Sequence, residues 1–294
     1  MKWGRMILFT ACIVVWGGLL LAMADSESSQ AWIKQGTELE GNRNSYGALK
    51  AYKKAIHADP NSAQAYQRLG CVYRSLGKPK DALRAFQKGA QIAPDNALGH
   101  FYLGRLYFEM GRNEDAKKEL ATASSKDPQM VDAIVLMAVI KKNEGDAGGA
   151  IALLQNAIKI NPDSFAAHSN LGNIYADRKL WPEAMREFQE AVRIDDTQAE
   201  TRRNFGFVCM QMGKIDKAIS ELSAAVGISP GYAVAYYNLA EAYSIKGLKG
   251  EAIWNYRKFL QLSDPEHDLS WRLKAMEEIQ AMEKAGFMEK HPEY

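Results

Sequence analysis

The sequence predicts an all-α protein, an α-solenoid of seven helical hairpins followed by a capping helix. One observation is a set of residues that recurs every 34 positions, and a second is the helical spacing of apolar residues within each period. The third is a composition of 47% hydrophobic and 24% charged residues, which is typical of a globular chain. A length of 294 residues would ordinarily suggest two domains, whereas the period predicts one continuous array.

The first 24 residues have the features of an export segment. Lys2 and Arg5 precede an uncharged stretch over residues 6–24, which ends in the small-x-small pattern Ala22-Met23-Ala24. The stretch is long for a signal peptide and just long enough to span a bilayer, so residues 1–24 are either a signal peptide or an N-terminal membrane anchor. Lys2 and Arg5 stay in the cytoplasm in both cases. We therefore expect the rest of the chain to be periplasmic, or anchored to the inner membrane facing the periplasm.

The charge balance argues against a nucleic-acid binder. The chain has 37 Lys and Arg residues against 35 Asp and Glu, and the surplus of two comes from Lys2 and Arg5. A protein that displaces counterions from nucleic acid needs a larger basic surplus. We therefore expect no nucleic-acid partner, and contact with a membrane only through the N-terminal segment if that segment is uncleaved.

No group of residues points to catalysis or to a cofactor. The three cysteines do not have the spacing of a metal site, and none of the five histidines has a second histidine four residues away. There is no glycine-rich phosphate loop after a predicted strand. His100 and His168 occupy equivalent places in the repeat, where we expect a role in packing or at the edge of a hairpin. We expect no enzyme activity, no metal and no cofactor.

The positions of prolines show the period of the repeat. Five of the nine prolines occur at positions 60, 94, 128, 162 and 230, so the step is 34 residues, with Asp196 at the one missing place. Counting from these marks divides the chain into seven rows, which cover residues 29–62, 63–96, 97–130, 131–164, 165–198, 199–232 and 233–266. We number the positions of each row from 1 to 34.

Small and large residues recur at the same row positions. Position 8 is small: Gly36, Gly70, Gly104, Ala138, Gly172, Gly206 and Ala240. Position 20 is always alanine: Ala48, Ala82, Ala116, Ala150, Ala184, Ala218 and Ala252. Position 24 is large and apolar: Tyr52, Phe86, Leu120, Leu154, Phe188, Leu222 and Tyr256. We expect two helices per row, whose backbones approach at positions 8 and 20 while position 24 fills the remaining space.

Turn residues separate the two helices of each row. Position 15 is glycine in five rows, which is typical of a left-handed helix stop: Gly77, Gly111, Gly145, Gly213 and Gly247. Proline at position 32 ends the second helix. We expect the next residue, Asn61, Asp95 or Asp163 in three of the rows, to cap the following helix.

This pattern resembles the tetratricopeptide repeat. Two rows carry it most fully, through Trp32, Gly36, Leu39, Ala48, Tyr52, Ala55 and Pro60, and through Tyr66, Leu69, Gly70, Tyr73, Ala82, Phe86 and Pro94. The resemblance implies a right-handed superhelix whose concave surface is lined by the first helix of each hairpin and binds a protein partner. Row four departs most, with Ile134 and Lys141 in place of aromatic residues, and we expect a looser hairpin there.

A capping helix is expected after the last row. Ser263-Asp264-Pro265 is typical of a helix start, and Leu269, Leu273, Met276 and Gln280 form an apolar-led stripe. We expect a capping helix over residues 267–286, with this stripe covering row seven, and a tail over residues 287–294.

The inward positions of the concave surface are expected to be 2, 5, 6, 9, 12 and 13. At position 6, Asn170, Asn204 and Asn238 follow one another in rows five to seven, and an amide can both donate to and accept from a peptide backbone. The three resemble the asparagine ladder of the O-linked N-acetylglucosamine transferase repeats, which holds extended peptide. Alternatively, these amides only solvate the wall of the groove.

The early rows differ from the late ones at the inward positions. Lys34, Arg68, Tyr102 and Arg105 predict a basic and aromatic floor suited to an acidic or aromatic partner. Alternatively, the long side chains cover neighbouring apolar surface.

These observations predict a non-enzymatic interaction scaffold of the bacterial cell envelope, which binds an extended peptide or a helix of a protein partner in its groove. The alternative is a regulatory or substrate-presenting subunit of an envelope enzyme, such as a glycosyltransferase or a peptidoglycan hydrolase. The oligomeric state and the partner's identity stay open.

Overall fold

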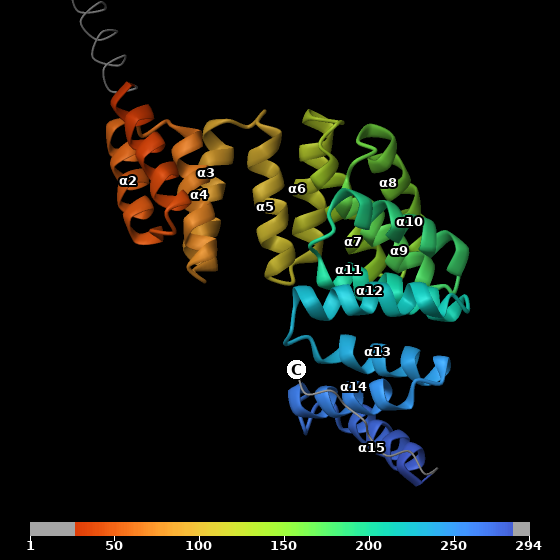
Figure 1. Ribbon diagram of the computed structural model, residues 1–294. Helices are drawn as coiled ribbons and strands as arrows, with labels where there is room; N and C mark the ends of the chain where they lie inside the picture. Colours follow the sequence, from red (N-terminus) through yellow and green to blue (C-terminus); the bar gives the residue numbers. More distant parts are fainter. Residues whose placement is uncertain (1–26, 285–294) are drawn as a thin grey trace, which may run out of the picture. The chain divides into compact units, whose positions relative to one another are not determined.

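The computed structural model describes residues 27–284, so the predicted leader and tail lie outside the described part of the chain. Every regular element within residues 27–284 is a helix, as Figure 1 shows. The chain divides into two compact units, Met1–Ile140 (unit 1) and Lys141–Tyr294 (unit 2). The division falls within row four, the row whose sequence departs most from the repeat.

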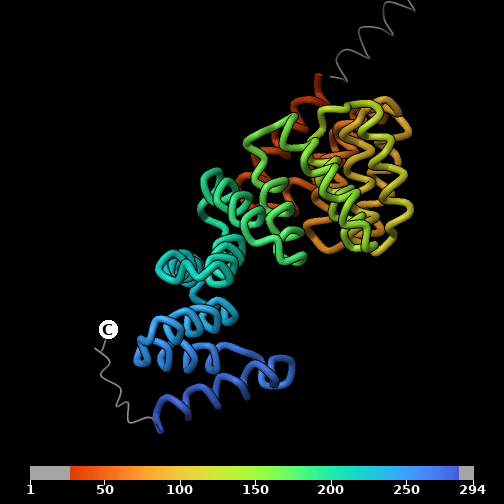
Figure 2. Tube along the Cα trace, turned by 90° about the vertical axis from the view of Figure 1, so that its right-hand side faces the viewer, coloured from red at the N-terminus to blue at the C-terminus, as the bar shows by residue number. Residues whose placement is uncertain are grey.

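Helices follow one another as hairpins in both units, and the predicted all-α class is confirmed. Unit 1 contains a helix at residues 27–41, then α2 (Ser45–Ala58), α3 (Ala63–Ser75), α4 (Pro79–Ile92), α5 (Ala97–Glu109), α6 (Asn113–Lys126) and most of α7 (Val131–Asn143). Unit 2 contains α8 (Ala147–Ile160), α9 (Phe165–Asp177), α10 (Trp181–Ile194), α11 (Ala199–Gln211), α12 (Ile215–Ile228), α13 (Ala233–Lys246), α14 (Lys249–Leu262) and α15 (Leu269–Lys284). Figure 2 shows the hairpins of unit 2 in chain order.

The close approach of the two helices within a hairpin depends on the small residue at position 8. A Cβ atom added to Gly70 would lie 2.5 Å from the ring of Phe86, and one added to Gly206 would lie 2.6 Å from Leu222. The large residues at position 24 are fully buried, with Phe188 at 0% exposure. The predicted packing of a large residue at position 24 against a small residue at position 8 is therefore confirmed in the hairpins whose position 8 is glycine.

Position 15 adopts the left-handed conformation in all seven rows, including the two that lack glycine. The five glycines have φ between 67° and 87°. Arg43 and Lys179 occupy the same position and have φ of 56° and 58°. The hairpin therefore requires this backbone conformation whatever the residue, and a side chain there is strained because its Cβ crowds the carbonyl.

Replacing Lys179 with glycine is expected to raise the free energy of unfolding by about 0.5–1 kcal/mol, because glycine adopts positive φ without the Cβ clash. Urea unfolding followed by circular dichroism measures the change. Lys179→Ala is the matched control, since alanine removes the long side chain but keeps the Cβ atom. An equal gain from Lys179→Ala would contradict the explanation.

The predicted helix caps are wrong by one residue. Ser62, Asn96 and Ser164, rather than the residues before them, accept hydrogen bonds from the first turns of α3, α5 and α9. The reason is a turn over row positions 31 to 34, in which the Ser62 N–H donates to the Asp59 carbonyl at 3.2 Å. Proline takes the second place of this turn, so the fourth residue begins the next helix.

The capping helix forms, but the prediction of its packing face is wrong. Leu269, Leu273 and Met276 are about half exposed at 55%, 52% and 47%, whereas Ala275 and Met282 are buried in the last cluster of unit 2. Arg272 sets this rotation of α15, because its guanidinium donates at 2.6 Å to the Leu260 carbonyl and to the Ser263 hydroxyl at the end of α14. The predicted stripe therefore faces away from row seven.

A polar bridge recurs at row position 4. His168 makes a 2.7 Å contact with Glu187 of α10 through one ring nitrogen and a 3.0 Å contact with the Pro162 carbonyl through the other. His100 repeats both contacts in row three, with Glu119 and Pro94. In row six the guanidinium of Arg202 takes the same place between Glu221 and the Asp196 carbonyl. Each bridge joins the two helices of a hairpin to the preceding row.

Candidate functional site

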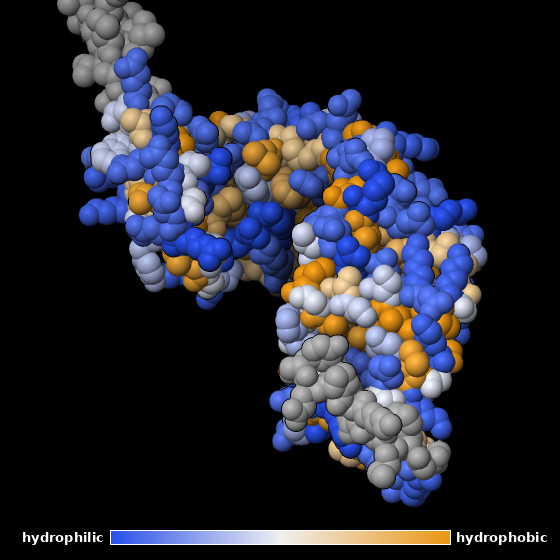
Figure 3. Space-filling model, in the orientation of Figure 1, coloured by the Kyte–Doolittle hydropathy of each residue, from blue (hydrophilic) through white to orange (hydrophobic). Residues whose placement is uncertain are grey.

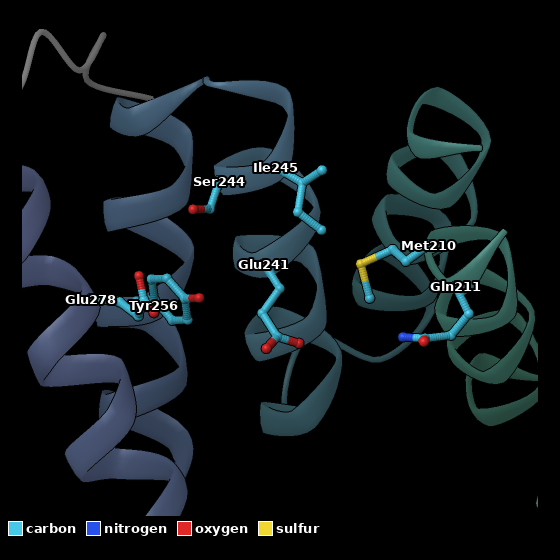
Figure 4. Close-up of a pocket in the computed structure, with 7 residues that line it drawn as sticks. All are labelled: Met210, Gln211, Glu241, Ser244, Ile245, Tyr256 and Glu278. Carbon is cyan, nitrogen blue, oxygen red and sulfur yellow. The ribbon is translucent and has the colours of Figure 1, made fainter. Parts of the chain in front are cut away.

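Three hollows line one face of unit 2, and the predicted inward row positions supply most of their walls. The first, of about 300 Å³, is the amide hollow, lined by Lys142, Asn173, Ala176, Asp177, Glu200, Arg203, Asn204 and Phe207. The second, of about 340 Å³, is the aromatic hollow, lined by Phe207, Tyr237, Asn238, Glu241, Ser270, Trp271 and Lys274. The third, of about 240 Å³, is the acidic hollow in Figure 4, lined by Met210, Gln211, Glu241, Ser244, Ile245, Tyr256 and Glu278.

The hollows adjoin one another through shared residues. Phe207 of α11 belongs to the amide and aromatic hollows, and Glu241 of α13 belongs to the aromatic and acidic hollows. The first helices of rows five to seven, α9, α11 and α13, therefore present a continuous surface, to which α15 adds a wall.

The three predicted asparagines are not equivalent. In the amide hollow, Asn204 of α11 donates to the Asn173 side-chain oxygen of α9 at 2.8 Å. Asn238 is 3% exposed in the aromatic hollow, and its side-chain oxygen has no hydrogen-bond partner among the described residues. Asn170 lines none of the three hollows and donates to the Ala166 carbonyl of its own helix at 2.8 Å. The amides therefore do not form a ladder of three like rungs.

Asn173 was missed in the sequence analysis, although its row position 9 is one of the expected inward positions. Among residues 27–284, its side-chain nitrogen has no hydrogen-bond partner after its oxygen accepts from Asn204, and Asn204 keeps an acceptor oxygen and a second N–H. The pair therefore offers both donors and an acceptor to the amide hollow.

The wall that α15 contributes could not be found from the repeat, because the rotation of this helix depends on tertiary contacts. Trp271 is 45% exposed and packs edge-on against Tyr237, with ring centroids 4.6 Å apart. Lys274 donates to Glu241 at 3.1 Å, and hydrogen bonds from Lys274 to Tyr237 and Glu241 raise the pKa of the lysine. An exposed tryptophan beside a paired charge is typical of a binding surface.

Unit 1 brings together part of the predicted basic and aromatic floor. The guanidinium of Arg105 lies 5.4 Å from the ring centroid of Phe101 and 5.3 Å from that of Tyr102, both on α5. Burial raises the pKa of Tyr102, and the nearby charges of Arg68 and Arg105 oppose this rise. Lys34 is exposed on the helix at residues 27–41, and no described contact joins it to this cluster.

The surfaces of the two units are mainly hydrophilic on the side that Figure 3 shows, with smaller apolar patches between charged residues. Within residues 27–284 no group of three or more His, Cys, Asp and Glu residues is arranged to hold a metal ion. No helix in that range is long and apolar enough to cross a bilayer.

Comparison with known families identifies the repeat. Tetratricopeptide repeat profiles match residues 51–84, 73–139, 143–203 and 233–265, and a TPR repeat profile matches residues 206–247. The chain belongs to the tetratricopeptide repeat family. Proteins with this repeat are generally protein-interaction scaffolds.

Curated relatives match parts of this tetratricopeptide repeat protein. The ycf37 protein of Cyanophora paradoxa is 31% identical over 109 residues, which cover 36% of this chain and 63% of the relative. The chloroplastic tetratricopeptide repeat domain-containing protein PYG7 of Arabidopsis thaliana is 30% identical over 97 residues, covering 32% of each chain. The chain thus spans less than two thirds of the length of these relatives.

Solved structures share the fold at low identity. Pseudomonas aeruginosa pilF is 18% identical with a TM-score of 0.66, and the match covers 76% of this chain and 99% of that one. A chain of the APC/C hetero-tetramer Cut9–Hcn1 is 17% identical with a TM-score of 0.65, covering 89% of this chain and 48% of that one. Yeast Tom70 is 15% identical with a TM-score of 0.57, covering 90% and 55%.

Proposed function

We propose that this protein is an exported, non-enzymatic scaffold of the bacterial envelope, which binds an extended segment of a partner protein on the inner face of its repeats. The family supports a role in protein interaction, and the pattern of residues 1–24 supports export. The protein would be periplasmic, or anchored to the inner membrane through that segment.

The amide hollow is the observation that carries the proposal. An extended peptide presents one N–H donor and one carbonyl acceptor per residue, and the Asn173–Asn204 pair presents donors and an acceptor of its own. Such contacts hold a peptide backbone without requiring a particular sequence. Each would contribute about 0.5–1.5 kcal/mol, so two amides suit a ligand that is released readily.

The inner face of unit 1 suits an acidic segment of the partner. Lys34 and Arg68 are exposed, and neither forms an ion pair with a described residue. Arg74, by contrast, is paired with Glu109 at 2.7 Å. A carboxylate of the partner would supply the negative counter-charge that Arg68 and Arg105 lack.

Site-specific photo-crosslinking in intact cells tests the proposal. A photoreactive amino acid replaces Phe207, which lies between the amide and aromatic hollows, and in a second arm it replaces Arg68. We expect both positions to crosslink to a partner protein. Tyr46, which is 71% exposed on α2, is the control position, where no crosslink to that partner is expected.

The double variant Asn173→Ala, Asn204→Ala is then compared with Asn156→Ala, which removes an exposed amide from α8. We expect the double variant to reduce crosslinking from position 207 about tenfold, since two hydrogen bonds are lost, and Asn156→Ala to leave it unchanged. Undiminished crosslinking in the double variant would exclude the amide hollow as the binding surface.

A further inference from the structure

The acidic hollow differs from the amide and aromatic hollows because it is lined by two carboxylates and by no basic residue. Figure 4 shows Glu241 of α13 between Met210 and Gln211 of α11 on one side and Tyr256 and Glu278 on the other. The helices beyond α11 supply four oxygen-bearing side chains: Glu241 and Ser244 from α13, Tyr256 from α14 and Glu278 from α15.

The hollow carries an uncompensated negative charge. Glu278 forms no ion pair with any described residue, and Glu241 shares its charge with one cation, Lys274, at 3.1 Å from its Oε1 oxygen. Two carboxylates and one ammonium leave a net charge of minus one.

Tyr256 offers the acidic hollow a hydroxyl that has no hydrogen-bond partner among the described residues. The residue is 1% exposed and lines the hollow, yet its hydroxyl makes no hydrogen bond with any described residue. Burial raises the pKa of the phenol, and the carboxylates of Glu241 and Glu278 raise it further. The hydroxyl is therefore neutral, with lone pairs available to a donor. The hydroxyl opens into the hollow, where it can accept a hydrogen bond from a ligand.

The walls of the hollow suit a side chain rather than a bare ion. Its volume of about 240 Å³ is much larger than a metal ion, and Met210, Ile245 and the Tyr256 ring supply apolar surface. Lysine and arginine combine an apolar stem with a cationic head that only donates hydrogen bonds. These properties match the apolar walls, the free carboxylate and the unpartnered hydroxyl.

We propose that the acidic hollow binds a lysine or arginine side chain of the partner segment, with the cationic head between Glu278 and Tyr256. This inference rests on the proposed peptide-binding function of unit 2 and adds a side-chain preference to it. The adjoining aromatic hollow receives an apolar side chain of the same segment, against Phe207 and Trp271.

Selection from a random heptapeptide library displayed on phage tests the preference. The bait is the immobilised full chain in mild detergent, as wild type, as Glu278→Gln and as Glu277→Gln. The last variant removes the same charge from the neighbouring residue of α15, which lies outside the acidic hollow. We expect lysine and arginine to be at least about threefold more frequent at one peptide position in the wild-type and Glu277→Gln pools than in the Glu278→Gln pool.

A synthetic peptide from the wild-type pool gives the second measurement, by fluorescence anisotropy. Replacing its basic residue by neutral citrulline or norleucine is expected to weaken binding to the wild type about tenfold and binding to Glu278→Gln less than twofold. Tyr256→Phe is expected to weaken binding without lowering the melting temperature, because the hydroxyl has no partner to lose in the free protein.

The outcomes separate this inference from the proposed function. Pools that contain selected peptides with equal basic content for all three baits would overturn the preference and leave peptide binding intact. If the wild type selected no peptide at all, both the preference and the binding of extended peptide by unit 2 would be contradicted.

Discussion

Replacing Phe188 with alanine is expected to lower the free energy of unfolding by about 3–5 kcal/mol, the cost of deleting a fully buried aromatic side chain. The ring is 0% exposed on α10, and it fills the space left open by the absent Cβ of Gly172, which would lie 2.9 Å from the ring. Alanine would leave a cavity between α9 and α10, because the two backbones already approach closely.

Urea unfolding measures the Phe188→Ala effect as a shift in the transition of unit 2. Ile245→Ala is the control, since that side chain is 62% exposed on α13 and its loss should change the free energy of unfolding by about 0.5 kcal/mol or less. Because each repeat contacts only its neighbours, we expect the loss to be concentrated in rows four to six. Equal effects from both variants would show that the interior of the hairpin does not depend on position 24.

Arg202→Met is expected to cost about 2–3 kcal/mol, because it leaves the carboxylate of Glu221 without its charged partner. The side chains of Arg202 and Glu221 are only 15% and 14% exposed, so water replaces the lost contact poorly. Thermal and urea unfolding measure the loss.

Two further variants isolate the bridge. Arg84→Met breaks a pair whose arginine is 77% exposed, and it should cost about 0.5 kcal/mol or less. Arg202→His should recover part of the stability, because histidine makes the same bridge in rows three and five. If Arg202→His is as unstable as Arg202→Met, the bridge geometry is not the source of the stability.

The repeat period was sufficient to predict the hairpins because it reports on local packing. Gly70 and Phe86 lie 16 residues apart, and the small residue leaves the space that the large side chain fills. The same holds for the left-handed turn at position 15, which glycine marks in five rows. Lys179 and Arg43 adopt the same turn without glycine, and only their place in the 34-residue period indicates that the turn occurs there.

Features that depend on the rotation of a helix about its own axis, or on contacts with distant segments, could not be predicted from the repeat. The helix cap at Ser62 depends on a turn that begins at Asp59, and the outward stripe of α15 depends on the hydrogen bonds of Arg272. The aromatic and acidic hollows have α15 as a wall, so the repeat predicted Asn204 and Asn238 but not Trp271 or Glu278. Burial also distinguishes Asn238 from Asn170, although both occupy position 6.

Glu241 belongs to two neighbouring hollows, so a change at this one codon alters both. Its replacement by glutamine would remove a negative charge from the acidic hollow and also release Lys274 into the aromatic hollow. The first hollow would become less negative while the second became positive. A single substitution at Glu241 would therefore change the ligand preference of both hollows at once, and related chains could diverge in this way.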